Sequence, residues 1–185
     1  MDDSPVRPVF IQGTGLFLFL FDESSPEHYQ WINDPEINVY TSRHRLPITR
    51  LAAQQYAETC QKDDQMVLGI WADPGGHVGN ISLKNINMID RCAELSILIG
   101  KRKRRGVGTE ACRLLCAHGF YQLGLNRIYC GTHEHNIGMQ KLAVKLGMQE
   151  EGRSRQAFFK HGDYADIIHY GVLKEEFIHA DLRLN

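Results

Sequence analysis

The chain has 185 residues, of which 43% are hydrophobic, 9% aromatic and 23% charged, and its formal net charge is -1. A chain of this length can bury a sizeable core, so we expect a single domain over residues 1–185. The composition excludes low-complexity and collagen-like chains, and the near-neutral charge argues against a protein that coats nucleic acid.

The N-terminal residues MDDSPVRP carry acids and prolines where a secretory signal needs positive charge and an apolar stretch. No apolar run approaches the ~18 residues of a membrane-spanning helix. The five cysteines are odd in number, lack CxxC spacing and mostly lie in apolar segments, which is typical of reduced, structural thiols. We therefore expect a cytoplasmic protein with no membrane partner.

The first part of the chain combines one apolar stretch with several helix starts. Residues 9–21 contain LFLFLF, which predicts a strand buried on both faces. Ser25-Pro26 and Asp34-Pro35 each place a side-chain acceptor before a proline, which predicts two short helices. A third helix is predicted over residues 49–60, behind a threonine cap.

The middle of the chain changes to a strand pattern. Residues 65–72, 78–88 and 91–100 are separated by turn-rich segments, which predicts an antiparallel meander. A helical period then runs from Gly106 to about Leu123-Gly124.

The last part of the chain alternates again. It predicts a strand at 126–132, a helix from Asn136 to Gly147, two strands within 148–173 and a last helical turn in KEEFIHA. The whole order predicts a mixed α/β (α+β) domain.

The stretch KRKRRGVGTEA, Lys101–Ala111, places five cations before a Gly-x-Gly that opens a helix. A helix N-terminus attracts anions, and glycines let a phosphate approach the backbone. Three other interpretations remain open: a nuclear-localisation or nucleic-acid run, a dinucleotide-binding G-x-G-x-x-A, and a solvated basic turn. The run is held between a strand and a helix, and three meander strands precede it, so phosphate binding is favoured.

The segments ELSILIGKRKRRGVGTEA, NRIYCGTHEHN and NIGMQKLAVKLGMQEEGRSRQAFFKHGDYADIIHYGVLKEEF together resemble the GNAT superfamily of acetyl-CoA-dependent N-acetyltransferases. WINDPEINVYT is also similar to a branch that includes ribosomal-protein and amino-sugar acetyltransferases, so the resemblance covers nearly the whole chain. The pyrophosphate-loop pattern of this family falls on Lys103–Gly108 and departs only at its first position, where lysine replaces glutamine or arginine.

The resemblance implies a mostly antiparallel sheet with one splayed parallel strand pair, Glu94–Ile99 and Arg127–Thr132, and flanking helices. Acetyl-CoA, the implied cosubstrate, would lie between these strands and pair with the backbone of Ile97 and Ile99. Asn136 matches a family asparagine that meets the pantetheine, although it is equally a good helix N-cap. The implied cofactor-binding residues are Ile97, Ile99, Lys103, Arg104, Arg105, Gly106, Val107, Gly108, Thr109, Asn136 and Lys141.

Glu94 is the candidate catalytic base, since it begins the strand that would flank the thioester. It would take the proton of the amine or hold the cationic amine, while the alternative is a carboxylate paired with a nearby arginine. Many relatives carry a tyrosine or a serine that protonates the thiolate, and these positions are Ala143 and Met139 here. A thiol pKa of about 8.5 lets the thiolate leave unprotonated, so transfer is not excluded.

His133 and His135 follow the second splayed strand, and no third ligand stands beside them, so no metal is expected. The amine is expected to meet the first helices, where there is a polar cluster that could equally be an ordinary loop: Asn33, Asp34, Glu36, Tyr40, Arg43 and His44.

The resemblance implies an acyltransferase that moves acetyl from acetyl-CoA to a primary amine of a small molecule, such as an amino sugar or a nucleotide-linked amino sugar. A protein N-terminal acetyltransferase and a non-catalytic acyl-CoA-binding module are the alternatives. Nucleic acid is not an expected partner. The sequence leaves open whether the protein forms a homodimer.

Overall fold

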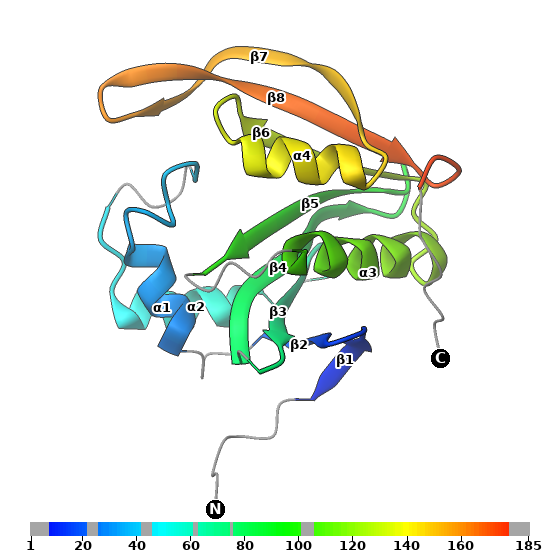
Figure 1. Cartoon of the computed structure of the whole chain (residues 1–185), viewed down its shortest axis with the longest axis horizontal. Coiled ribbons are helices and arrows are strands. Elements are labelled where there is room, and N and C mark those ends of the chain that lie inside the picture. Colours follow the sequence, from blue (N-terminus) through cyan, green and yellow to red (C-terminus); the bar gives the residue numbers. More distant parts are fainter. Residues whose placement is uncertain are drawn as a thin grey trace, which may run out of the picture.

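The computed structural model describes residues 8–21, 26–41, 46–60, 63–74, 76–100 and 106–177. Its strands and helices follow one another as shown in Figure 1. The strands are β1 Val9–Gln12, β2 Leu16–Leu20, β3 Met66–Ala72, β4 Gly76–Asn87, β5 Cys92–Ile99, β6 Arg127–His133, β7 Gln149–Lys160 and β8 Asp163–Leu173. The helices are α1 Pro26–Asn33, α2 Arg50–Thr59, α3 Val107–Tyr121 and α4 Ile137–Lys145.

The strands form one sheet in the order β1-β2-β3-β4-β5-β6-β8-β7. Every neighbouring pair is antiparallel except β5 and β6, which are parallel. The predicted mixed fold, its meander β3-β4-β5 and its single parallel pair are therefore confirmed. Consecutive strands that are joined by short turns pair as antiparallel neighbours, whereas β5 and β6 are connected through α3 and can run in parallel.

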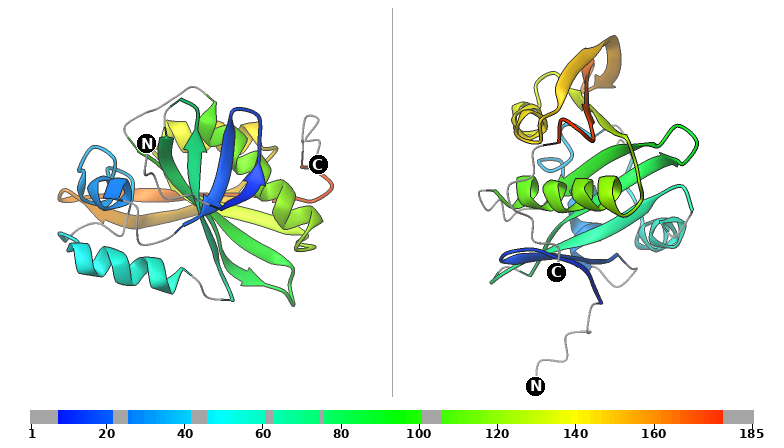
Figure 2. Two further views of the ribbon diagram at one scale, coloured as in Figure 1. Left: turned by 90° about the horizontal axis from the view of Figure 1, so that it is seen from below. Right: turned by 90° about the vertical axis from the view of Figure 1, so that its right-hand side faces the viewer.

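The helices cover both faces of the sheet (Figure 2). The helix α3 buries Ala111, Leu114 and Leu115 against sheet residues such as Leu83 and Leu95. On the opposite face, α2 buries Ala57 in a second apolar cluster. Successive side chains of a strand point to opposite faces of the sheet, so alternate residues of a strand face the helices on one side and on the other.

The predicted long strand over residues 9–21 is wrong, since it is a hairpin of β1 and β2. The chain reverses where Gly13 N–H donates to Leu16 O at 2.9 Å, and Gly15 has a φ of +71°, a conformation that glycine adopts without strain. Leu18 and Phe19 of β2 are nonetheless fully buried, on opposite faces. The apolar pattern thus predicted the burial and missed the turn.

The predicted helix at Asp34-Pro35 is also wrong, because this segment forms turns. Asn38 is buried and donates from Nδ2 to the carbonyls of Trp31 and Ile32, at 3.0 and 2.6 Å, which caps the end of α1. Asp34 Oδ1 accepts from Glu36 N–H at 2.9 Å and holds the turn that follows.

The last helical turn predicted in KEEFIHA is a hydrogen-bonded turn over residues 174–176, in which Glu176 and Phe177 N–H donate to the Leu173 carbonyl at 3.0 and 3.1 Å. Residues 178–180 of that prediction lie outside the described residues. The other predicted helices are confirmed. Thr49 Oγ1 accepts from Ala52 N–H at 3.2 Å at the start of α2. All five cysteines are free thiols, and four of them are buried. None of the described helices has the length and apolar character needed to cross a membrane.

Candidate active site

The parallel strands β5 and β6 pair over three residues only: Cys92 with Arg127, Ala93 with Ile128, and Glu94 with Tyr129. Beyond Glu94 the two strands separate, and within the described residues β5 has no strand partner on this edge. An unpaired strand edge presents N–H and C=O groups that can bind an extended ligand. The predicted splay is therefore present, and its apex is the Glu94–Tyr129 pair.

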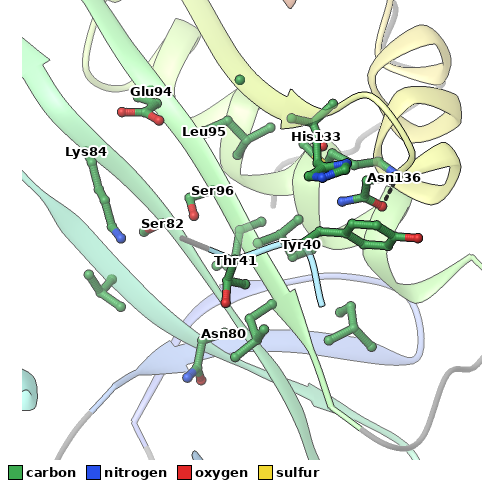
Figure 3. A pocket seen from close by; sticks show the side chains of 18 of the residues that line it. Tyr40, Thr41, Asn80, Ser82, Lys84, Glu94, Leu95, Ser96, His133 and Asn136 are labelled. Carbon is green, nitrogen blue, oxygen red and sulfur yellow. Dashed lines mark hydrogen bonds between the residues drawn. The ribbon is translucent and has the colours of Figure 1, made fainter. Parts of the chain in front are cut away.

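A cavity of about 1220 Å³ occupies this gap and passes through the sheet. On the side of α3 and α4 it is lined by Ile97, Ile99, Gly108 and Leu142. On the side of α1 and α2 it is lined by side chains of the alternate register, including those of Ser82, Lys84, Glu94 and Ser96 (Figure 3). We call the first the donor side and the second the acceptor side.

The predicted cofactor-binding residues separate into three groups. Ile97, Ile99, Gly108 and Asn136 line the cavity, as does the predicted base Glu94. The structure does not bring Gly106, Val107, Thr109 and Lys141 to its wall: the first three lie at the start of α3, and Lys141 is exposed on α4. Lys103, Arg104 and Arg105 lie outside the described residues, as do Arg43 and His44.

At two of these positions the local backbone explains the residue type. Gly106 is the N-cap of α3 with a φ of +91°, in the left-handed region that favours glycine. Asn136 is the N-cap of α4, where its Oδ1 accepts from Met139 N–H at 3.2 Å. The capping role predicted for Asn136 is confirmed, and its side chain also borders the cavity.

Glu94 lies at the apex of the gap, held by a neighbour on β4. Asn85 Nδ2 donates to Glu94 Oε2 at 2.9 Å. Asn85 has a φ of +50° in the irregular stretch of β4 between Lys84 and Asn87, a conformation that asparagine tolerates better than most residues. One hydrogen bond therefore holds the carboxylate at the apex of the gap.

Tyr129 lies opposite Glu94 on β6 and also lines the cavity. Burial raises the pKa of its phenol, the electrostatic influence of Glu94 and of Cys92 adds to this, and a hydrogen bond with Asn85 and the charge of Arg127 partly oppose it. The phenol stays protonated at neutral pH. It can donate a hydrogen bond at the apex, a possibility that the sequence did not reveal because nothing marks Tyr129 among the strand residues of β6.

Residues 16–149 match the family model of the acetyltransferase (GNAT) domain, which is most of the chain. The chain therefore belongs to the GNAT acetyltransferase family. This confirms the resemblance read from the sequence and the expected class of enzyme.

Individual relatives of this GNAT protein agree with that assignment. It is 33% identical over 104 residues to YdaF of Bacillus subtilis (strain 168), which is named as a ribosomal N-acetyltransferase, covering 56% of this chain and 57% of that one. It is 29% identical over 105 residues to spermidine N(1)-acetyltransferase of Escherichia coli (strain K12), covering 56% of each. The chain thus spans little more than half the length of the curated relatives it matches.

The fold is shared with solved GNAT structures. Spermidine N-acetyltransferase from Vibrio cholerae, solved in complex with CoA and spermine, superposes with a TM-score of 0.82 at 20% identity. The alignment covers 89% of this chain and 98% of that one. At this identity the likeness concerns the fold.

His133 follows the gap on β6 and forms part of the acceptor wall of this GNAT domain. Its ring lies between Tyr40 and Phe158, with ring centroids 5.2 and 4.7 Å away. Its Nδ1 accepts from His135 N–H at 3.0 Å, so in the neutral ring the proton is on Nε2. Burial and the neighbouring His135 lower the pKa of His133, partly opposed by Glu134. His133 is therefore a neutral hydrogen-bond donor at neutral pH.

His135 is exposed and does not line the cavity. Across the described ranges, no group of three histidine, cysteine, aspartate or glutamate side chains is placed to hold a metal ion.

The polar cluster predicted after α1 serves two purposes. Glu36 and Tyr40 line the cavity. Asn33 does not, because its side chain bonds Ile48 N and O at 2.9 and 3.0 Å and ties α1 to the segment before α2. Lys160 of β7 donates to the carbonyls of Asn38 and Thr41, which fastens this segment against the β7–β8 hairpin.

A serine–histidine pair on the acceptor side was not predicted. Ser154 Oγ and His169 Nε2 are 2.7 Å apart, and His169 lines the cavity. Its only sequence signal is the alternation Ile168, His169, Tyr170 in the last strand, where a polar residue interrupts buried neighbours. The partner Ser154 lies in an irregular stretch of β7, and its pairing with β8 has no local signature.

Proposed function

We propose that this chain transfers the acetyl group of acetyl-CoA directly to a primary amine of a small molecule. The observation that carries the proposal is a single cavity that crosses the sheet at the splayed strands. Its volume, about 1220 Å³, exceeds that of a typical single-ligand pocket, as a site for two substrates requires. The two substrates would enter from opposite faces and meet at the gap.

The donor side has the features that a CoA arm requires. The free edge of β5 beyond Glu94 offers backbone groups to the pantetheine, and an N–H there would polarise the thioester carbonyl. The start of α3 lies beside this edge, and helix N-termini favour phosphate. Lys103, Arg104, Arg105 and Lys141 remain proposed phosphate contacts, with Gly106, Val107 and Thr109 supplying backbone.

The acceptor side has the charge that a cationic amine requires. Three carboxylates, of Glu36, Asp64 and Glu94, and one ammonium, of Lys84, line the cavity. Aromatic rings of Tyr40 and other residues stand beside them, and such rings attract cations. We propose a small cationic amine, with amino sugars and nucleotide-linked amino sugars as one class and polyamines, named for the E. coli relative, as another.

Glu94 is the proposed base. An ammonium ion must lose a proton before its nitrogen can attack the thioester, and a carboxylate at the apex of the gap can both attract the cation and accept that proton. The hydrogen bond from Asn85 holds one carboxylate oxygen and leaves the other available. Asn85 would thus act as a positioning residue for Glu94.

The proposal is tested by following thiol release from acetyl-CoA with a panel of amines. We expect release with a small amine, glucosamine or spermidine among those assayed, and mass spectrometry should find the N-acetylated product. Release with a ribosomal N-terminal peptide alone would instead favour the protein acetyltransferase that the name of the B. subtilis relative implies. Saturable CoA binding with no release for any acceptor would favour a non-catalytic module.

The two roles of Asn136 can be separated by two substitutions. Asn136→Ala removes the cap of α4 and the side-chain amide, so it should cost about 1 kcal/mol of stability and weaken CoA binding. Asn136→Ser restores a capping oxygen without the amide, so stability should return while CoA affinity stays low. Thermal unfolding and a CoA titration of both variants measure the two effects. Full CoA affinity in both would exclude the pantetheine contact.

Two features remain predictions of the sequence, one domain over residues 1–185 and a cytoplasmic location, and the oligomeric state stays open to a homodimer.

A further inference from the structure

The Ser154–His169 pair lies on the acceptor side of the cavity, across the β6–β8–β7 part of the sheet. Ser154 belongs to β7 and His169 to β8, and both are half-buried. Their 2.7 Å contact joins Ser154 Oγ to Nε2 of the imidazole. One ring nitrogen is thereby anchored, and the orientation of the other is set by the neighbouring strand.

That neighbouring strand is β6, where Gly131 pairs with His169. A Cβ atom at Gly131 would lie 3.6 Å from His169 Nδ1 and 3.7 Å from Cε1. The imidazole therefore lies over bare backbone of the strand that borders the gap. In the described part of the chain, no hydrogen bond is made by Nδ1. A titratable nitrogen is thus presented at the cavity wall.

Other groups at this wall are less suited to move a proton twice. His133 Nδ1 already accepts from the backbone of His135, and its Nε2 carries the proton in the neutral ring. Tyr129 stays protonated, because burial raises its pKa. The positions where relatives carry a proton donor are Ala143, which is fully buried, and Met139.

We propose that His169, held by Ser154, carries the proton from the attacking nitrogen to the leaving sulfur of the acetyl transfer. Once Glu94 has taken the first proton of the ammonium, the amine attacks and its nitrogen becomes cationic. An N–H bond then breaks and an Nδ1–H bond forms on His169. When the C–S bond of the thioester breaks, the thiolate receives this proton and His169 returns to its neutral form.

Ser154 fits this cycle because its hydroxyl oxygen can accept a hydrogen bond from Nε2–H. With the proton of the neutral ring on Nε2, Nδ1 is left with a lone pair to accept the second proton, and Nε2–H still donates to Ser154 Oγ in the imidazolium. A hydrogen bond to the charged form stabilises that form, so Ser154 supports proton uptake. Ser154 is thus a positioning residue. The inference rests on the proposed transfer and supplies the proton donor that Ala143 and Met139 do not.

The charged and titratable groups on this side of the sheet set the pH dependence. The carboxylate of Glu151, on β7, interacts electrostatically with His169. The other groups are Glu94 of β5 and Arg127, Tyr129 and His133 of β6. His169 must be neutral to accept a proton, so protonation of its imidazole at low pH should lower kcat.

His169→Gln is the direct test, with His161→Asn as the control. Glutamine can keep a hydrogen bond to Ser154 but cannot carry a proton, so kcat should fall about 10²- to 10⁴-fold with CoA affinity unchanged. The loss of kcat at low pH that protonation of the imidazole causes should disappear. His161 is exposed in the β7–β8 turn with a φ of +56°, which asparagine tolerates, and His161→Asn should keep the wild-type profile.

Ser154→Ala provides an independent measurement, including the case that His169→Gln does not fold. Loss of the hydroxyl should lower kcat about 3- to 10-fold and move the acid limb to lower pH, since the imidazolium loses an acceptor. A folded His169→Gln variant with wild-type kcat and pH profile would overturn the shuttle alone, as would an unchanged profile in Ser154→Ala. A wild-type protein that releases no thiol with any amine would overturn both the shuttle and the proposed function.

Discussion

Gly108→Trp is expected to abolish CoA binding and to leave the protein folded. Gly108 lies in the first turn of α3 and lines the donor side of the cavity. A Cβ there would contact Leu142, Ile97 and Ile99 at 3.5–3.8 Å, which is ordinary packing, so the backbone tolerates a side chain. An indole, however, would fill the space beside the β5 edge. Calorimetric titration should show affinity reduced by about 100-fold or more, equivalent to ~2.7 kcal/mol.

Two further variants sharpen this experiment. Gly108→Ala places only a methyl group in the same position, so it should bind CoA with little change and keep or raise helix stability. Val144→Trp adds an indole on the exposed face of α4, outside the cavity lining, and should bind CoA normally. If Gly108→Trp binds CoA like the wild type, the assignment of the donor side is wrong.

Glu94→Gln should lower kcat by about 10²- to 10⁴-fold, with little effect on CoA affinity. Glutamine keeps the size of the side chain and accepts a hydrogen bond from Asn85, but it neither attracts an ammonium ion nor accepts its proton. The acceptor KM should rise as well, because one of the carboxylates on the acceptor side is lost. Steady-state kinetics over a range of pH, with acetyl-CoA saturating, give both quantities.

Glu175→Gln is the matched control for Glu94, since Glu175 is exposed in the turn after β8 and away from the cavity. It should leave kcat and KM unchanged. Equal rates for Glu94→Gln and wild type across the pH range would remove Glu94 from the role of base. Asn85→Ala, which releases the carboxylate, should give a smaller loss of kcat than Glu94→Gln because the acid group is still present.

The elements of the fold were largely predictable because their signals are local. The helix α4 begins at Asn136, whose side chain caps it, and α2 begins behind Thr49 in the same way. The strands of the meander were bounded by turn residues. The hairpin within residues 9–21 was missed because both of its strands are apolar at several positions, and a turn centred on Gly13 and Gly15 does not interrupt that pattern.

Residues of the candidate site could be predicted only where they belong to a family motif or occupy a position that the family resemblance marks. Glu94, Gly108 and Asn136 lie at the cavity as expected. Lys141 lies exposed on α4 and outside the cavity wall, and its contact with the CoA phosphates remains a prediction. The face of a helix on which one residue lies depends on where the helix begins and how it packs.

The sequence by itself determined most of the helices and strands and the glycine at the start of α3, because capping, turn chemistry and apolar periodicity act between residues close in the chain. The family was predicted from the resemblance of its motifs. Only the tertiary structure decided that Tyr129 stands opposite Glu94, that Gly131 leaves His169 exposed to the gap, and that Ser154 holds its ring. These contacts join separate strands, and their register follows from how the whole sheet packs between its helices. The apolar pattern of a strand indicates which residues share a face, but it does not indicate which residue of another strand lies opposite each of them.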